Sequence, residues 1–238
     1  MPQLRHRPLD RVQNRYEIQK LLGSGAFGTV YGCTDSELQT PVALKEMHVL
    51  DARIGGMEGE REAALAQFRA EAIHLSNLNH PHIVRGHYER DSGAWRVCRV
   101  CGLDFPQLRE CPDHGGALEW LDARHYLVMD YIAGPDLLAR AEAEGGRLDI
   151  AEALEWMRQI ASALAHVHAR GFVHRDLRRP SNISGERFDN ILLTETGLRL
   201  IDVGISVLRH QVGEPFFASY VRHEQEELAA FGAFLLGR

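Results

Sequence analysis

The chain has 238 residues, of which 45% are hydrophobic and 25% charged, which is typical of a soluble globular protein with one large domain or two small lobes. The formal net charge of −6, with no basic stripe, argues against nucleic-acid binding. No apolar run is long enough to span a membrane and the first ten residues lack the apolar segment of a signal peptide, so we expect a cytoplasmic protein.

The first part of the chain predicts a strand, a glycine-rich turn and two further strands. Residues 1–15 are polar, and we expect this lead-in to have little structure of its own. From Tyr16 apolar residues alternate as in a strand, and the run that follows reads G-S-G-A-F-G-T-V at 23–30. Glycines let a backbone approach phosphates closely, although the same run could be a simple hairpin turn. The next apolar strand, V-A-L-K-E-M, contains Lys45; a lysine on a strand face is more often a solvated edge residue.

A helix is predicted over residues 61–79, and it contains an acidic residue, Glu71, in the run Q-F-R-A-E-A. The apolar face of this helix is formed by Phe68, Ile73, Leu75 and Leu78. The carboxylate of Glu71 could pair with the strand lysine or with a neighbour on its own helix. The sequence N-H-P at 79–81 ends the helix, and we expect the next strand to begin at His82.

A cysteine-rich segment at 95–120 interrupts two strands of the first half. Cys98 and Cys101 form one Cys-x2-Cys pair, and Cys111 and His114 form a second pair with the same spacing, each followed by glycine. Three thiolates and one imidazole are a closed tetrahedral ligand set for structural Zn²⁺, and the segment resembles a zinc ribbon. The alternative is a loop with three free thiols. An insertion at an exposed hairpin tip disturbs a core least, so we expect it there.

A strand at 125–132 leads into the sequence A-G-P-D at 133–136, and a long helix follows at 150–169 with Asp149 as its N-cap. The residues of that helix that recur at helical spacing, and are expected in the core, are Leu154, Met157, Ile160, Leu164 and Val167.

The stretch from His174 to Gly204 contains groups suited to binding Mg²⁺. It reads H-R-D-L-R at 174–178, N-I-L-L at 190–193 and I-D-V-G at 201–204, with a T-E-T-G turn between two short strands. This is a hairpin flanked by two carboxylates and a carboxamide. Oxygen ligands of this kind suit Mg²⁺, which prefers one or two carboxylates together with phosphate oxygens.

These motifs, in this order, resemble the catalytic domain of eukaryotic-type serine/threonine protein kinases. The resemblance extends over residues 16–238 and is strongest up to Gly204. It implies an α+β, bilobal, protein-kinase-like fold. The expected parts are a small antiparallel β lobe with one helix at 16–132, with a zinc ribbon inserted in one of its hairpins at 95–120, and a mainly helical, truncated large lobe at 133–238.

The resemblance also implies ATP as a cofactor, with Mg²⁺ or Mn²⁺, beside structural Zn²⁺. The residues expected to bind the nucleotide are Gly23, Gly25, Gly28, Val30, Ala43, Lys45, Glu71, Met129, Asp130, Ile132 and Asp136. Among these, Lys45 would hold phosphates with Glu71 as its partner, Met129 would be the gatekeeper, and Asp136 could serve the ribose, cap the next helix, or do both.

The same resemblance assigns the catalytic groups. Asp176 would accept the proton of the substrate hydroxyl, and Arg178 stands where many kinases carry a lysine near the γ-phosphate. Asp202 would hold the metal ion. The loop is longer than in the family, and we prefer Asn190 over Asn182 as the second metal ligand because N-I-L-L leads directly into the hairpin.

Two departures separate this sequence from ordinary kinases: the insertion at 179–189 and the short end after Gly204, which lacks an A-P-E motif. Glu227 stands in the last predicted helix where the family often has Asp. The leading hypothesis is an ATP-dependent kinase acting on Ser/Thr hydroxyls of protein substrates. The alternatives are a nucleotide-binding pseudokinase or scaffold that contacts a regulatory protein through the ribbon, and a minimal kinase like the atypical RIO family. The sequence does not disclose the oligomeric state.

Overall fold

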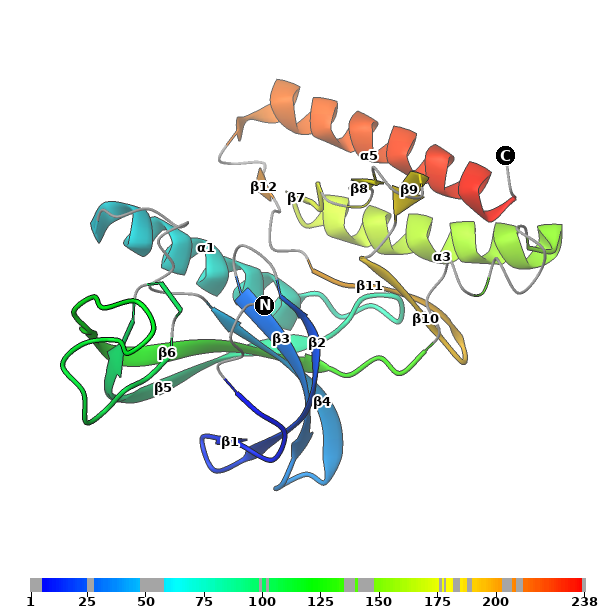
Figure 1. Ribbon diagram of the computed structural model, residues 1–238. Coiled ribbons are helices and arrows are strands. Elements are labelled where there is room, and N and C mark those ends of the chain that lie inside the picture. The colour runs from blue at the N-terminus through cyan, green and yellow to red at the C-terminus, as the bar shows by residue number, and fades with distance from the viewer. Residues whose placement is uncertain are drawn as a thin grey trace. The chain divides into compact units, whose positions relative to one another are not determined.

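The computed structural model divides into two compact units, one made of residues 1–73 and 86–131 and the other of residues 74–85 and 132–238 (Figure 1). The described residues are 6–24, 28–47, 58–98, 100–101, 103–134, 140, 148–175, 177, 179–181, 185–187, 190–202, 207–208 and 212–236.

The first unit contains an antiparallel sheet and one helix. The strands are β1 (Arg11–Val12), β2 (Tyr16–Ser24), β3 (Gly28–Asp35), β4 (Thr40–Met47), β5 (Gly86–Val97) and β6 (Glu119–Asp130), and they lie side by side in the order β1-β2-β3-β4-β6-β5. Strands β5 and β6 pair far beyond the end of β4, so they form the two-stranded stem of the cysteine-rich segment. This confirms the predicted insertion of that segment in a hairpin.

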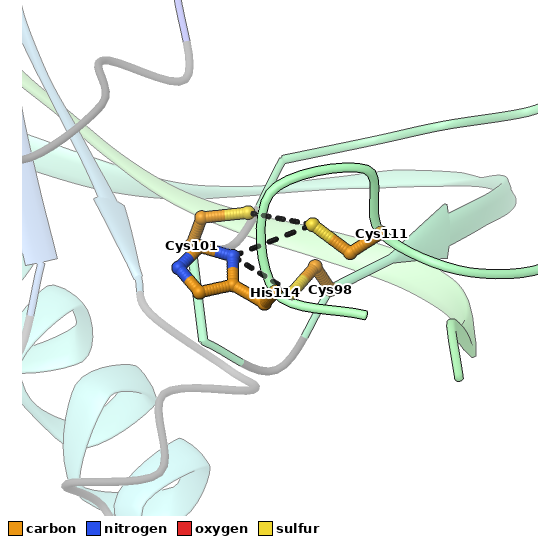
Figure 2. A group of neighbouring side chains, drawn as sticks. All are labelled: Cys98, Cys101, Cys111 and His114. Carbon is orange, nitrogen blue, oxygen red and sulfur yellow. Dashed lines mark hydrogen bonds between the residues drawn. The ribbon is translucent and has the colours of Figure 1, made fainter. Parts of the chain in front are cut away.

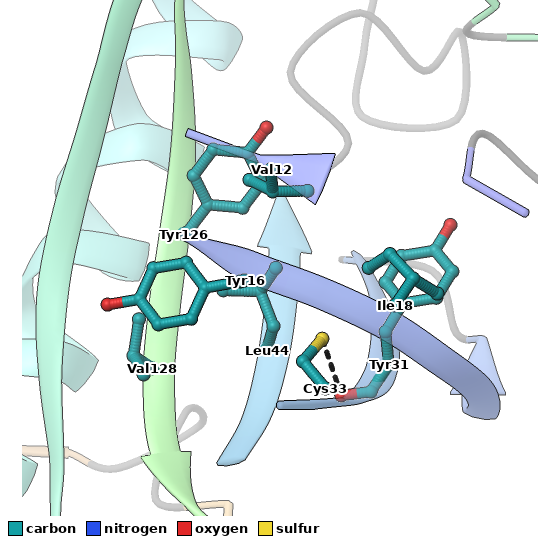
Figure 3. Close-up of a cluster of buried hydrophobic side chains, with 8 residues drawn as sticks. All are labelled: Val12, Tyr16, Ile18, Tyr31, Cys33, Leu44, Tyr126 and Val128. Carbon is teal, nitrogen blue, oxygen red and sulfur yellow. Dashed lines mark hydrogen bonds between the residues drawn. The ribbon is translucent and has the colours of Figure 1, made fainter. Parts of the chain in front are cut away.

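A hydrophobic core covers one face of this sheet (Figure 3). The members of this core are Val12, Tyr16, Ile18, Tyr31, Cys33, Leu44, Tyr126 and Val128. Leu44 lies between Tyr31 and Val128 in the register of the ladders, so three neighbouring strands contribute to one row. Because side chains alternate along a strand, this row leaves the residue after Leu44, which is Lys45, on the opposite face.

The N-terminal lead-in is more ordered than the sequence indicated. Strand β1 pairs with β2, and Val12 is buried in the core. Arg15 follows β1, and its guanidinium donates three hydrogen bonds of 2.7–3.1 Å to the carboxylate of Asp35 at the end of β3. Polar composition predicts little structure here, but pairing of β1 with β2 satisfies backbone groups of this segment.

We expect Asp35→Asn to lower the free energy of unfolding by about 2 kcal/mol at pH 7. The Arg15 guanidinium holds the pKa of Asp35 at about 2, below its usual 3.8. Because the folded state favours the carboxylate, the stabilisation is complete above pH 4 and is lost as the pH falls towards 2.

Urea unfolding at pH 7 and at pH 3 measures this effect, and the difference between wild type and Asp35→Asn should be smaller at pH 3. Asp122→Asn, at a carboxylate whose side chain is 93% exposed, is the matched control and should change stability little at either pH. Equal effects of the two substitutions would contradict the prediction.

Helix α1 (Glu58–Asn77) begins in the first unit, and its last turn belongs to the second. Phe68, Leu75 and Leu78 are buried, as predicted. Ile73 is 57% exposed, so its assignment to the apolar face was wrong, and Ala72 occupies that face instead. With a period of 3.6 residues, positions 68, 72 and 75 lie on one side of the helix and position 73 does not.

The second unit combines two long helices with short hairpins. Its elements are α3 (Ile150–Ala169), β7 (Phe172–Val173), β8 (Arg179–Ser181), β9 (Gly185–Arg187), β10 (Ile191–Thr194), β11 (Gly197–Leu200), β12 (Val207–Leu208) and α5 (Glu214–Leu235). Strands pair as β7 with β12, β8 with β9, and β10 with β11. Helices α3 and α5 pack along each other (Figure 1). The two units together confirm the predicted α+β class.

Helix α3 has the predicted boundaries, and Ile160, Leu164 and Val167 are buried as predicted, but Leu154 is not. Asp149 caps the helix, because its Oδ1 accepts a hydrogen bond of 2.8 Å from the N–H of Ala151. Leu154 is 63% exposed, whereas Trp156 is buried. The buried residues are Ala153, Trp156, Gln159, Ile160, Ala163, Leu164 and Val167. The buried side is thus close to the predicted one, and packing against α5 and β11 buries Trp156 where the prediction had Leu154.

Residues 82–84 do not begin a strand of the first sheet, which was the prediction. They lie beside β11 in the second unit, where Leu200 donates its N–H to the carbonyl of His82 and accepts from the N–H of Val84. Strand β5 begins only at Gly86. Among the helices of the described part of the chain, none is both long and apolar enough to span a membrane.

Candidate active site

Lys45 and Glu71 form a buried ion pair in the first unit. The Nζ of Lys45, on β4, lies 2.8 Å from Oε1 and 3.2 Å from Oε2 of Glu71, on α1. The two side chains are 11% and 5% exposed, so the cation and the carboxylate need each other as partners. The reading of Lys45 as a solvated edge residue is therefore excluded by its position.

Lysine is a rare residue in this protein. The sequence contains two lysines, Lys20 and Lys45, against 25 arginines. Lys20 is exposed, whereas Lys45 is 8% exposed as a residue. A chain that otherwise uses arginine for its cations keeps a lysine at this buried position, which indicates that a compact ammonium, and not a planar guanidinium, is needed there.

The strand register places three further predicted residues on the same face as Lys45. Val30 is directly opposite Lys45 across β3 and β4, and Ala43 is directly opposite Met129 across β4 and β6. Ala43 and Lys45 are two residues apart on one strand, so their side chains share a face. The ion pair therefore lies next to a patch built from small and apolar side chains.

The other described residues of the expected nucleotide site come from strand ends. Gly23 pairs with Val30 in the β2–β3 ladder, and no described atom lies within 4 Å of the place where its Cβ would be. Gly28 differs, because a Cβ there would lie 2.5 Å from the carbonyl oxygen of Glu46, so glycine is needed for the close approach of β3 and β4. Asp130 is the last residue of β6. Ile132 is the first residue after this strand that belongs to the second unit.

In the second unit, the β10–β11 hairpin brings Asn190 and Asp202 to its open end. The N–H of Ile201 donates to the carbonyl oxygen of Asn190 at 2.9 Å, which places the residues that flank the hairpin side by side. Asp202 has a φ of +54°, a conformation that residues other than glycine rarely adopt and that is concentrated at functional sites. The fully buried His174 places its Nε2 2.9 Å from the carbonyl oxygen of Ile201.

Glu224, on α5, is a residue that the sequence reasoning missed. One carboxylate oxygen accepts the N–H of Arg175 at 2.5 Å, and the other lies 2.6 Å from Nε2 of His168. Arg175 has a φ of +67°, so this buried carboxylate holds an unfavourable backbone conformation directly before position 176. Glu227, which stands where the family often has Asp, is also buried and lies 3.8 Å from His223.

A periodic signal in α5 could have identified Glu224. Phe217, Glu224 and Phe231 are all buried and follow each other at intervals of seven residues, which is close to two helical turns. A carboxylate within such an apolar stripe must have a partner inside the protein. Glu227 is also buried, so burial alone does not separate the two residues.

We expect Glu224→Ala to lower the free energy of unfolding by about 3 kcal/mol, because it removes the buried carboxylate that accepts the N–H of Arg175 and leaves a cavity in its place. Denaturant unfolding measures this change. Glu226→Ala is the matched control on the same helix, since the Glu226 side chain is 71% exposed, and it should change stability by less than about 0.5 kcal/mol. Equal stability of the two variants would contradict the anchoring role.

Five residues of the expected site, Gly25, Asp136, Asp176, Arg178 and Asn182, lie outside the described residues.

The cysteine-rich insert brings its four candidate ligands together (Figure 2). The Sγ atoms of Cys101 and Cys111 are 3.9 Å apart, and Nδ1 of His114 lies 3.4 Å from Sγ of Cys111 and 3.8 Å from Sγ of Cys98. A tetrahedral zinc ion with ordinary bond lengths requires about 3.8 Å between two sulfurs and about 3.6 Å between sulfur and nitrogen. The four side chains therefore have the spacing of a tetrahedral metal site.

Backbone contacts in the first Cys-x2-Cys turn also suit a thiolate. Burial raises the pKa of Cys98, but the N–H groups of Cys101 and Val100 point at its sulfur, and the net pKa is lowered. The Sγ of Cys98 accepts the Val100 N–H at 3.4 Å. Donors aimed at a sulfur stabilise the ionised form that binds a metal.

Comparison with known proteins agrees with this fold. The family model described as protein kinase domain matches residues 16–222. The serine/threonine-protein kinase PrkC of Bacillus subtilis is 31% identical over 188 residues, covering 79% of this chain and 23% of that protein. The probable serine/threonine-protein kinase pknA2 of Bifidobacterium longum is 29% identical over 191 residues, covering 80% of this chain and 21% of that protein.

A solved structure of Rad53 in complex with AMP-PNP has a TM-score of 0.59 to this chain at 21% identity, covering 93% of this chain and 48% of that one. This likeness shows the fold. Because the family model matches most of the chain, the chain belongs to the protein kinase domain family. The chain spans about a fifth of the length of the two curated relatives above, and about a third of the length of another curated kinase that it matches.

Proposed function

We propose that this chain is the catalytic domain of a protein serine/threonine kinase, which transfers the γ-phosphate of ATP to hydroxyl groups of protein substrates. The observation that carries the proposal is the buried pair of Lys45 and Glu71, on a face that also carries small and apolar side chains. Its relatives PrkC and pknA2 bear the name of serine/threonine-protein kinases, and the Rad53 structure of the same fold contains an ATP analogue, AMP-PNP.

The described side chains fit ATP and a divalent cation. Lys45 would bind phosphate oxygens with its ammonium held in place by Glu71. Asp202 and Asn190 would hold Mg²⁺ or Mn²⁺, since a carboxylate and a carboxamide at one hairpin end are oxygen donors of the kind these ions prefer. When bound, the metal ion neutralises charge on the phosphate oxygens, and phosphoryl transfer depends mainly on such neutralisation and on positioning.

The assignment of the residues that act on the substrate hydroxyl rests on the sequence motif H-R-D-L-R at 174–178. Asp176 would take the proton of the substrate hydroxyl, and Arg178 would place a positive charge near the transferred phosphate. Glu224 and His174 support this assignment, because they fix the backbone and side-chain positions directly before Asp176. Asn182 remains the alternative to Asn190.

We further infer that Cys98, Cys101, Cys111 and His114 bind structural Zn²⁺. Four ligands close a tetrahedral site and leave no position for a reacting water molecule, so the ion would order the insert and would take no part in catalysis.

The test is transfer of labelled γ-phosphate from ATP by the purified chain to general protein substrates, with ATP binding measured by calorimetry on the same sample. The proposal expects both binding and transfer, with label on serine or threonine. Binding without transfer would instead support a nucleotide-binding scaffold. If the purified chain neither binds ATP nor transfers phosphate, the proposal is overturned.

A further inference from the structure

Helix α1 contacts the Lys45 face of the sheet at a second polar point. Lys45 on β4 is directly opposite Leu127 on β6, and Leu127 is directly opposite Tyr88 on β5. These three side chains therefore form one row across three strands on the same face. Glu71 meets the row at its β4 end, through Lys45. Arg69 of the same helix meets the row at its β5 end, through Tyr88.

The two contacts lie on opposite flanks of the helix. Glu71 and Arg69 are two positions apart, which is about 200° around a helix axis. Phe68, Ala72 and Leu75 are buried and lie between these flanks, on the side of the helix that faces the protein. A helix held by apolar contacts alone can rotate slightly about its axis, whereas a polar contact on each flank opposes rotation in both directions.

The second contact is a chain of hydrogen bonds that we call the Arg69 clamp, made of Arg69, Tyr88 and His125. The Nε of Arg69 donates to the Tyr88 hydroxyl at 3.3 Å, and that hydroxyl lies 2.5 Å from Nδ1 of His125 on β6. The guanidinium also lies over the Tyr88 ring, with Cζ 5.8 Å from its centroid. The strands β5 and β6 thus hold the helix through one tyrosine.

The protonation state of His125 allows its Nδ1 to accept a hydrogen bond from the Tyr88 hydroxyl. His125 is 4% exposed. Its burial, and to a smaller degree the charges of Arg69 and Arg90, lower its pKa to about 4, whereas the charge of Asp122 acts in the opposite direction. The ring is therefore neutral at pH 7, and Nδ1 can accept the hydroxyl proton while the hydroxyl oxygen accepts from Arg69.

We propose that the Arg69 clamp is a positioning device that fixes the rotation of α1 and thereby holds Glu71 on Lys45. The clamp touches neither nucleotide nor substrate and acts through Glu71. The inference extends the proposed kinase function, on which its catalytic consequence rests, but its structural part can be measured without any catalysis.

The folded protein is treated with an amine-acylating reagent, and mass spectrometry of its peptides after digestion measures how fast Lys45 is labelled. An ion-paired ammonium is a poor nucleophile, so release of Glu71 should speed labelling of Lys45. Lys20, the other lysine, is exposed and serves as an internal standard within each sample. Tyr88→Phe removes one hydroxyl and should raise the ratio of Lys45 to Lys20 labelling about three- to tenfold, the range that one hydrogen bond can supply.

A double-substitution cycle separates positioning from general stability. Glu71→Gln alone should raise Lys45 labelling, and adding Tyr88→Phe to Glu71→Gln should change it no further, because the clamp acts through Glu71. Arg69→Met, at an exposed helical position, should reproduce the effect of Tyr88→Phe without loss of fold. Tyr16→Phe is the matched control: it removes a hydroxyl bound to Glu89 on the opposite face of the same sheet and should leave the labelling ratio unchanged.

Two results would overturn the inference: wild-type labelling ratios in both Tyr88→Phe and Arg69→Met, or a Tyr88→Phe effect that persists undiminished beside Glu71→Gln. In an active sample, kcat/KM for ATP should fall about three- to tenfold in the same two variants. If the wild-type chain transfers no phosphate while the labelling results hold, the proposed function fails and the clamp stands.

Discussion

Lys45→Met is expected to reduce phosphate transfer at least about 100-fold, the usual cost of removing one group that stabilises charge in a transition state. The methionine keeps the length and packing of the side chain but cannot bind a phosphate or pair with Glu71. The purified variant is assayed with labelled ATP beside the wild type, and its thermal unfolding is recorded to show that the fold persists.

Two further variants make this test specific. Lys45→Arg keeps the positive charge, but a planar guanidinium does not replace a compact ammonium in a site this enclosed, so transfer should remain low. Lys20→Met removes the other lysine, which is exposed and lies over the ring of Tyr131, and should keep wild-type transfer. Wild-type activity in Lys45→Met would refute the assignment of Lys45 and, with it, the proposed kinase mechanism.

Cys101→Ser is expected to abolish zinc binding and to disorder the insert between Cys98 and Leu118, while ATP binding is kept. The insert has little apolar surface of its own, and structural zinc contributes on the order of 10 kcal/mol to small sites of this kind. Elemental analysis of protein purified without chelator should find one Zn²⁺ in the wild type and none in the variant. Trypsin cleavage at Arg109, which is exposed within the insert, reports its order.

Cys33→Ala is the matched control, because Cys33 is a buried cysteine of the sheet core, remote in sequence from the insert, and its loss should leave zinc content unchanged. Acidification should release the metal as the thiolates are protonated. A wild-type zinc content near zero, or full metal retention in Cys101→Ser, would show that these four residues are not a zinc site.

The stem of the insert explains why its loss should remain local. The ladder of β5 and β6 extends through Val97 and Glu119, and only residues 126–130 of β6 also pair with β4. Those residues lie in the sheet core, with Tyr126 and Val128 buried. The two strands are thus held by packing that does not depend on the metal, while the loop beyond them is held by its ligands.

Features that depend on local spacing could be predicted from the amino-acid sequence. A Cys-x2-Cys pair and a Cys-x2-His pair predict a shared metal site because each pair forms a tight turn. The hairpin between Asn190 and Asp202 follows from two short apolar strands around a turn, and the structure places both residues at its open end. The family resemblance was predictable for the same reason, since its motifs are short and occur in a fixed order.

The fold was needed to show which residues at the margins of each helix's apolar side are buried, and which carboxylate of α5 accepts the N–H of Arg175. Periodicity allowed Leu154 in the core, and packing selected Trp156. Glu224 lies on one stripe of α5 with Phe217 and Phe231, but its partner, the N–H of Arg175, is far away in the sequence and is found only in the folded chain. The rotation of a helix is set by the partners that it packs against, and those partners come from distant parts of the chain. The Arg69 clamp has the same origin, because it joins a helix to two strands that no local pattern relates.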